Sequence, residues 1–357
     1  MSLELDALIF AAAILLAFGI DWCAGEPAAR WHPVVWMGNY LGWAGRHLQR
    51  FTRQALNHGS DYKAFILGAI SWSVGVAIVC VASWALQKGL LALPDALGPI
   101  PGGVLAALLL GLALKPMLSW AMLRSEVLAV EAALSPVQGG SLAAGRERLS
   151  WLVSRDVTHL TETQVRESAI ESLAENLNDS VVAPIFWFVL LGLPGAALYR
   201  FANTADAMWG YHGMRNGQNW EWAGKWAARA DDVLSWLPAR LTALLLALLC
   251  RPRTNSSVRP ESLAADQDRP VAASFVARLR LEASRTPSPN SGWPMAAMAL
   301  GVGVCLHKPG VYVLNAAGRA PQTHDTQRAL VYASKVVVAL VFIAQAALVV
   351  VATGGIL

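Results

Sequence analysis

Long apolar runs alternate with polar stretches along the whole chain of 357 residues. A helix needs roughly 20 mainly apolar residues to cross a bilayer. Runs near this length predict roughly five spanning helices, at about 5–20, 64–86, 102–123, 233–250 and 334–353. The polar stretches between them lie at about 21–63, 124–178, 203–232 and 251–292. We therefore predict an all-α, polytopic helical integral membrane protein with amphipathic helices and a single membrane-embedded domain over 1–357.

A further apolar run, 181–202, is interrupted in its middle by Leu193-Pro194-Gly195. Proline inside a helix removes a hydrogen bond and clashes with the preceding turn, and the following glycine suits a tight turn. Each arm has about ten residues, or roughly 15 Å, which is half a bilayer. We predict a re-entrant helical hairpin, which would return Asp179 and Asp206 to the same side.

Composition agrees with a membrane protein, because 55% of the residues are hydrophobic and 15% are charged, against about 25% charged in soluble domains. The net charge of +4 comes without a clustered basic face, so we expect no nucleic-acid partner. The four cysteines are far apart and form no C-x-x-C pair, which argues against a thiolate metal site or a disulfide framework.

The distribution of basic residues predicts how the chain lies in the membrane. Loops rich in Lys and Arg stay in the cytoplasm. The rule puts 21–63 and 124–178 in the cytoplasm, with the N-terminus outside. For 251–292 it conflicts with the counting of spans, so the sidedness of this stretch stays open. Its Arg, Ser and Pro content predicts flexibility over 251–291.

One segment combines a helix start with two regular stripes. Thr161 and Gln164 fit a capping box, with Thr161 as N-cap. One stripe of apolar residues recurs every four positions: Val165, Ala169, Leu173 and Leu177. Four carboxylates recur with the same spacing, displaced by two positions: Glu167, Glu171, Glu175 and Asp179. The two stripes therefore lie on opposite faces of one helix.

The acidic stripe has two interpretations. It is either a solvated helix face that tolerates like charges, or a cation site that holds Mg²⁺, which takes oxygen ligands and commonly bridges to substrate phosphates. The helix has no lysine, and Asn176, Asn178, Ser168 and Ser172 lie beside the carboxylates, which favours the cation site.

Three more polar groups interrupt apolar segments, where ionisable residues usually face a cavity or a partner. Asn203 and Asp206 share one helix face, and Asp231 and Asp232 stand where an apolar helix begins. Arg240 lies inside that helix, near Pro238. It would either pair with an aspartate or clamp a phosphate or carboxylate of a substrate.

Two other motifs bear on catalysis and nucleotide binding. His32, between Trp31 and Pro33, is either structural or catalytic, with the structural role favoured. Residues 140–147 have the glycine spacing of a P-loop but lack its Lys and Ser/Thr, so any nucleotide site must be of another kind.

The combined motifs resemble the CobD/CbiB cobinamide-phosphate synthases. They occur in that family's order over most of 21–292: Asp21 with Glu26-Pro27 and His32-Pro33-Val34; Ser154-Arg155-Asp156; 171–179; Ala183-Pro184-Ile185-Phe186-Trp187; Asn203-Thr204 with Asp206, Met208 and Gly210-Tyr211; Ala230-Asp231-Asp232 with 238–242; and Ser288-Pro289-Asn290 with Gly292.

The resemblance implies an ATP-dependent ligase that joins adenosylcobyric acid to (R)-1-amino-2-propanol O-phosphate, giving adenosylcobinamide phosphate. It implies Mg²⁺ and ATP as cofactor and co-substrate, with the corrinoid as substrate. Expected catalytic residues are Glu171, Glu175, Asp206, Asp231 and Asp232. Expected Mg²⁺ ligands are Glu171, Glu175 and Asp179. Expected substrate- and phosphate-binding residues are Arg155, Asn176, Asn203, Tyr211, Arg240, Asn290 and His32.

The same resemblance implies a multi-pass protein of the cell inner membrane, in contact with the lipid bilayer, with its active site facing the cytoplasm. Other late enzymes of the pathway are possible partners. Two rival functions fit the same sequence class: a permease for a corrinoid or a small anion, because broken helices also mark transporters, and a non-catalytic membrane sensor on the same scaffold.

Overall fold

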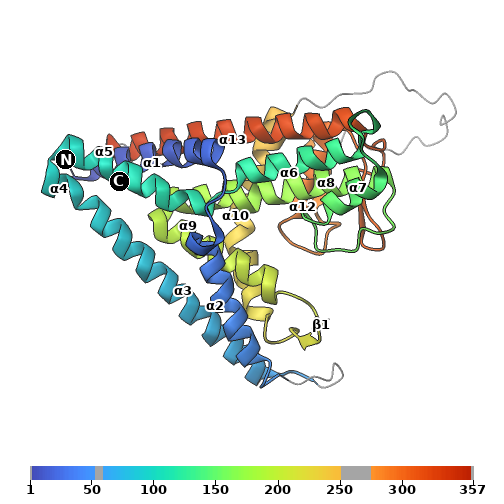
Figure 1. The fold of residues 1–357 in the computed structure, drawn as a ribbon, viewed down its shortest axis with the longest axis horizontal. Helices are drawn as coiled ribbons and strands as arrows, with labels where there is room; N and C mark the ends of the chain where they lie inside the picture. Colours follow the sequence, from blue (N-terminus) through green and yellow to red (C-terminus); the bar gives the residue numbers. More distant parts are fainter. Residues whose placement is uncertain (1, 53–58, 251–274, 355–357) are drawn as a thin grey trace. The chain divides into compact units, whose positions relative to one another are not determined.

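The computed structural model describes residues 2–52, 59–250 and 275–354 (Figure 1). The described chain is mainly helical, as predicted. Its α-helices are α1 Ser2–Ala24, α2 Pro33–Leu48, α3 Tyr62–Leu91, α4 Leu93–Leu97, α5 Pro99–Leu114, α6 Trp120–Leu134, α7 Leu142–Leu149, α8 Glu162–Leu177, α9 Ala183–Trp209, α10 Lys225–Leu249, α11 Phe275–Ala283, α12 Gly292–Val302 and α13 Thr323–Ala352.

Short elements connect these helices. Turns of 3₁₀-helix occupy Ala29–Trp31, Lys115–Met117 and Pro136–Gln138, and a π-helical turn occupies Asn178–Val182. Two antiparallel β-hairpins pair β1 Met214–Arg215 with β2 Gln218–Asn219, and β3 Leu306–Lys308 with β4 Tyr312–Leu314. Of the segment predicted to be flexible, residues 251–274 lie outside the described residues, and α11 forms part of the remainder.

In the described chain, six helical segments are long and apolar enough to cross a membrane: Glu4–Ala24, Tyr62–Leu97, Pro99–Leu134, Glu162–Trp209, Lys225–Leu249 and Thr323–Ala352. Five of them overlap the five predicted spans, and the remaining one, Glu162–Trp209, contains the run expected to form a hairpin. The prediction of an all-α polytopic membrane protein is confirmed.

The chain separates into two compact units. Unit 1 comprises Met1–Met122, Asp179–Pro238 and Val338–Leu357, and unit 2 comprises Leu123–Asn178 and Ala239–Val337. The single catalytic domain expected from the sequence stays a prediction.

In unit 1, α1 packs along α5, and α3 packs against both α2 and α9 (Figure 1). Small residues allow these approaches, as is usual between membrane helices. A Cβ on Gly111 of α5 would lie 3.0 Å from the backbone oxygen of Ala13, and one on Gly75 of α3 would lie 2.3 Å from the ring of Phe201. The bundle therefore depends on glycines at its helix crossings.

The predicted hairpin in α9 is confirmed. Gly192 has φ 69° and ψ −156°, a conformation that essentially only glycine adopts, so the helix breaks there. The break frees the Leu193 N–H, which donates to Gln87 Oε1 of α3 at 2.7 Å. The second arm then returns to the start of the first, because Asn203 Nδ2 lies 3.3 Å from Asp179 Oδ2. A straight helix would separate these residues by about 36 Å.

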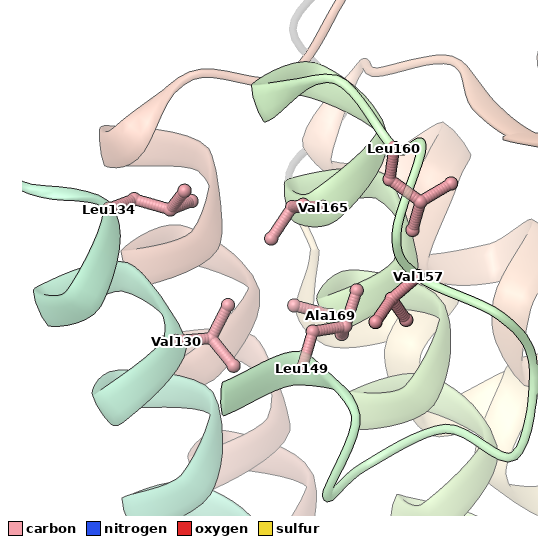
Figure 2. Packing of buried hydrophobic residues seen from close by; sticks show 7 residues of the cluster. All are labelled: Val130, Leu134, Leu149, Val157, Leu160, Val165 and Ala169. Carbon is pink, nitrogen blue, oxygen red and sulfur yellow. The ribbon is translucent and has the colours of Figure 1, made fainter. Parts of the chain in front are cut away.

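In unit 2, a hydrophobic cluster joins α6, α7, α8 and the loop between α7 and α8 (Figure 2). Its members are Val130, Leu134, Leu149, Val157, Leu160, Val165 and Ala169. The predicted capping box begins α8: the Gln164 N–H donates to Thr161 Oγ1, and the Thr161 N–H donates to Gln164 Oε1. The cluster and the cap together fix both the start of α8 and the loop that precedes it.

Candidate active site

The acidic face of α8 is buried. Glu167 is 6% exposed and Glu171 is 4% exposed, and the serines beside them, Ser168 and Ser172, are buried as well. The apolar stripe on the opposite face is also fully covered. The interpretation of this face as solvated is therefore wrong for Glu167 and Glu171. Buried carboxylates require charged or hydrogen-bonding partners, so the next question is which groups supply them.

Arg155 is the principal partner. Its Nη2 donates to Glu171 Oε2 at 2.9 Å and to Ser168 Oγ at 2.6 Å. The loop that carries Arg155 is anchored by Val157 and Leu160 in the hydrophobic cluster of Figure 2. The guanidinium is thus held in place by packing, while its Nε and Nη1 are buried and have no hydrogen-bond partner among the described residues.

The β3–β4 hairpin adds a second cation and a phenol. Its register places Lys308 directly opposite Tyr312, and the turn between them contains Gly310 at φ 72°. These side chains share a cavity of about 160 Å³ with α8. The cavity is lined by Leu152, Val153, Ser154, Arg155, Ser168, Glu171, Ser172, Glu175, Lys308 and Tyr312.

The Tyr312 hydroxyl is within hydrogen-bonding reach of the Glu171 carboxylate. Burial, and then the neighbouring carboxylates of Glu171 and Glu175, raise the pKa of the phenol far above its usual range. Tyr312 therefore keeps its proton at neutral pH and acts as a hydrogen-bond donor in this cavity.

In unit 1, the α9 hairpin collects polar groups around Asp179, which lies in the π-helical turn. Tyr199 Oη donates to Asp179 Oδ1 at 3.3 Å, and Asn203 Nδ2 donates to Asp179 Oδ2 at 3.3 Å. Arg200 Nη1 lies 3.5 Å from the Asp179 backbone oxygen and 3.3 Å from Ser180 Oγ. π-Helical turns are frequent at functional sites, and this one opens the hairpin.

Three more aspartates face this group. Asp206 interacts electrostatically with Asp179 and Asp232. Asp231 interacts with Asp179, Asp206 and Asp232 and accepts a hydrogen bond from Asn203. The Oδ1 atom of Asp231 is buried without a hydrogen-bond partner among the described residues. The structure therefore brings together Asp179, Asn203, Asp206, Asp231 and Asp232 and concentrates carboxylates there; the catalytic and binding roles of these residues stay predictions.

His32 lies in another buried ionic network of unit 1. Lys115 Nζ is 3.3 Å from Asp21 Oδ1 and 2.7 Å from Glu26 Oε2, and His32 Nε2 is 3.2 Å from the same Glu26 oxygen. The other ring nitrogen of His32 accepts from the Val34 N–H and caps α2. These contacts give His32 a structural role, and its role in substrate binding stays a prediction.

The remaining predicted residues lie elsewhere. In unit 2, Arg240 donates to Asn290 Oδ1 at 2.7 Å and stacks over the Trp293 ring at 4.9 Å, and neither Arg240 nor Asn290 lines the cavity beside Arg155. Asn176 donates to the Ser172 backbone oxygen of its own helix at 2.9 Å. In unit 1, Tyr211 lines a separate cavity of about 400 Å³.

The described residues contain no group of three or more His, Cys, Asp or Glu side chains that could hold a metal ion. Mg²⁺ is usually held by one or two carboxylates together with waters and substrate phosphates, so it needs no such cage. The aspartate group of unit 1, with the unsatisfied Asp231 oxygen, fits this mode of binding. Joint ligation by Glu171, Glu175 and Asp179 stays a prediction.

Sequence reasoning missed several members of these groups. Lys308 and Tyr312 were not proposed, although Pro309-Gly310 between them is a turn signal typical of a hairpin. Arg200 and Lys115 were also missed. Each is a charged residue inside an apolar run, which by itself indicates a buried partner or a functional site.

Comparison with known proteins gives one family. Residues 14–343 match the family described as CobD/Cbib protein. The probable cobalamin biosynthesis protein CobD of Methanothermobacter thermautotrophicus is 38% identical, covering 84% of this chain and 85% of that protein. The cobalamin biosynthesis protein CobD of Chromobacterium violaceum is 36% identical, over 84% and 81% of the two chains. That of Brucella anthropi is 31% identical, over 90% of each. No solved structure matches the chain.

Proposed function

Because the chain belongs to the CobD/CbiB family, we propose that it is the ligase that joins adenosylcobyric acid to (R)-1-amino-2-propanol O-phosphate at the expense of ATP, releasing adenosylcobinamide phosphate. The family places the chain in cobalamin biosynthesis. The ligation, its substrates and the use of ATP and Mg²⁺ are the proposed part.

The chemistry needs two kinds of charged site. A carboxylate is a poor electrophile, so its oxygen first attacks the γ-phosphorus of ATP, which gives an acyl phosphate and ADP. The amine nitrogen then attacks the acyl carbon, the carbon–oxygen bond to phosphate breaks, and the amide and inorganic phosphate are released. The first step needs countercharge for a triphosphate, and the second needs a base that takes the proton from the amine.

The observation that supports this assignment most is the aspartate group formed by the α9 hairpin. Asp179 and Asp206 are proposed to hold Mg²⁺, which would neutralise phosphate charge when bound. Asp231 or Asp232 is proposed as the base, because Asp231 presents a buried carboxylate oxygen that has no hydrogen-bond partner among the described residues. Arg200, which contacts the Asp179 backbone, is a further cation at this place.

The charged groups of unit 2 are proposed to handle substrate. Arg155 and Arg240 each present a guanidinium fork, which suits a phosphate or carboxylate. Glu171 and Glu175 are proposed to contact a cationic group. We also propose that the protein resides in the inner membrane with these groups open to the cytoplasm, where ATP is available, since the basic loops favour that side.

A detergent assay tests the function directly. Purified protein would receive adenosylcobyric acid, aminopropanol phosphate, ATP and Mg²⁺, and the amide would be followed by mass spectrometry. We expect ATP-dependent product from the wild-type chain and none from Asp206→Asn. The matched control, Asp95→Asn, alters an exposed aspartate of α4 and should keep full activity.

Detergent has no compartments, so product formation excludes pure transport. Uptake of a corrinoid into vesicles without product in detergent would support a permease and refute the proposal. Full activity of Asp206→Asn would remove the aspartate group from the mechanism but leave the ligase function standing.

A further inference from the structure

The cavity beside α8 carries equal numbers of positive and negative groups. Arg155 and Lys308 are cations, and Glu171 and Glu175 are carboxylates. Such a lining matches a small molecule with one charge of each sign better than it matches a simple anion. We propose that this cavity binds the phosphorylated amino alcohol, and that Lys308 and Tyr312 are the residues that select for its phosphate.

The phosphate end is indicated by unsatisfied donors. Arg155 Nη2 donates to Ser168 and Glu171, while its buried Nε and Nη1 have no hydrogen-bond partner among the described residues. These two N–H groups lie on different edges of the planar guanidinium, and each can donate to a phosphate oxygen. Lys308 forms no ion pair with any described carboxylate within contact distance, and its ammonium lies 5.9 Å from the Tyr312 ring. Lys308 extends the donor set from the other wall of the cavity, where the single Tyr312 O–H, which lies within reach of Glu171 in this structure, would turn to the phosphate when the substrate ammonium reaches the carboxylates.

The ammonium end is indicated by α8. Glu175 lines the cavity one helical turn, about 6 Å, beyond Glu171. Glu171 belongs to the same wall, where it accepts from Arg155 and interacts with Tyr312. We assign the substrate ammonium to this pair of carboxylates, and the phosphate to the cations Arg155 and Lys308.

The size of the cavity argues against a nucleotide. Sites for drug-sized ligands usually have volumes of about 300–1,000 Å³, whereas this cavity has about 160 Å³. It is large enough for a phosphate with a few further atoms. We therefore assign this cavity to the amine substrate and not to ATP, which the proposed function assigns to the aspartates of unit 1.

The β3–β4 hairpin makes the selection for phosphate a local property. Lys308 and Tyr312 face the cavity because the register pairs them across a tight turn. This inference rests on the proposed function for the identity of the substrate, but the binding it describes can be measured without any turnover.

Calorimetric titration of the full-length protein in detergent tests it. The probes are aminopropanol phosphate, free aminopropanol, inorganic phosphate and Mg²⁺–ADP, and the variants are Lys308→Gln and Tyr312→Phe. Each change removes a donor to a charged phosphate, so we expect the Kd for aminopropanol phosphate to rise about tenfold or more for Lys308→Gln and severalfold for Tyr312→Phe. The Kd values for Mg²⁺–ADP and for free aminopropanol should stay unchanged.

A matched control exists in the same unit. Lys335 and Tyr332 of α13 form a similar cation–aromatic pair at 5.7 Å, outside this cavity. Lys335→Gln and Tyr332→Phe should bind every probe as the wild type does. In the ligation assay, Lys308→Gln should raise the KM for aminopropanol phosphate and leave the KM for ATP as it was.

The outcomes separate the two proposals. Unchanged binding of aminopropanol phosphate in both cavity variants, or weakened binding of Mg²⁺–ADP instead, overturns the inference even if the ligase reaction is observed. Selective loss of aminopropanol phosphate binding supports the inference even if no amide forms, in which case only the proposed reaction fails.

Discussion

Replacing Gly192 by alanine tests whether the α9 hairpin depends on one backbone conformation. At φ 69° and ψ −156°, a residue with a Cβ is strained by about 1–3 kcal/mol. The added Cβ would also lie 2.3 Å from Gln87 Oε1, which accepts the hydrogen bond from the Leu193 N–H. Losing that bond leaves a buried amide unsatisfied, at a further cost of about 1–3 kcal/mol. We expect Gly192→Ala to lower the free energy of unfolding by about 2–6 kcal/mol.

The measurement is unfolding in mixed micelles with increasing denaturing detergent, followed by tryptophan fluorescence. Gly89→Ala in α3 is the control, because its Cβ would meet no atom within 4 Å. In a helix interior this change should stabilise by up to about 1 kcal/mol. Ligase activity should fall in Gly192→Ala alone, since Asn203 and Asp206 would move away from Asp179. Equal stability of the two variants would refute the dependence of the hairpin on this glycine.

Three other predictions concern stability, thiol reactivity and metal. Glu131→Gln breaks a buried pair in which Arg166 Nε lies 3.0 Å from Glu131 Oε1, so it should cost about 3 kcal/mol of unfolding free energy. Glu162→Gln breaks the ion pair between Arg166 and Glu162, whose side chain is 54% exposed, and should cost only about 0.3–0.5 kcal/mol. Similar losses of unfolding free energy in the two variants would contradict the role of burial. Burial raises the pKa of the Cys250 thiol to about 12, so at pH 8 the reactive thiolate is rare, and its fraction should rise at more alkaline pH. In the folded protein, maleimide should label the exposed Cys23 and spare Cys250. Rapid labelling of Cys250, read by peptide mass spectrometry, would argue against its burial. Removal of Mg²⁺ by a chelator should stop amide formation while the unfolding curve stays in place, and turnover that persists without divalent ions would remove the metal from the proposal.

Much of the fold is a local property of the sequence. A continuous apolar run favours a spanning helix wherever it occurs, so the predicted spans overlap the segments found. The break in α9 was also predictable, because proline restricts the backbone and glycine frees it at their own positions. The observed break lies slightly earlier than the predicted one: the non-helical residue is Gly192, just before the Leu193-Pro194-Gly195 motif. The start of α8 followed from the Thr161 capping box in the same way.

The charged groups depended on tertiary structure to a much greater degree. The spacing of Glu167 and Glu171 showed that they share one helix face, but their burial depends on what packs against that face. Those partners come from distant parts of the chain: Arg155 from a preceding loop, and Lys308 with Tyr312 from a hairpin more than a hundred residues later. Burial and pairing are sums over such contacts, so helical periodicity alone could not distinguish a solvated face from a lined cavity. The sequence by itself determined which segments are helices and where they break, and only the packing of those helices decided which carboxylates lie beside which cations.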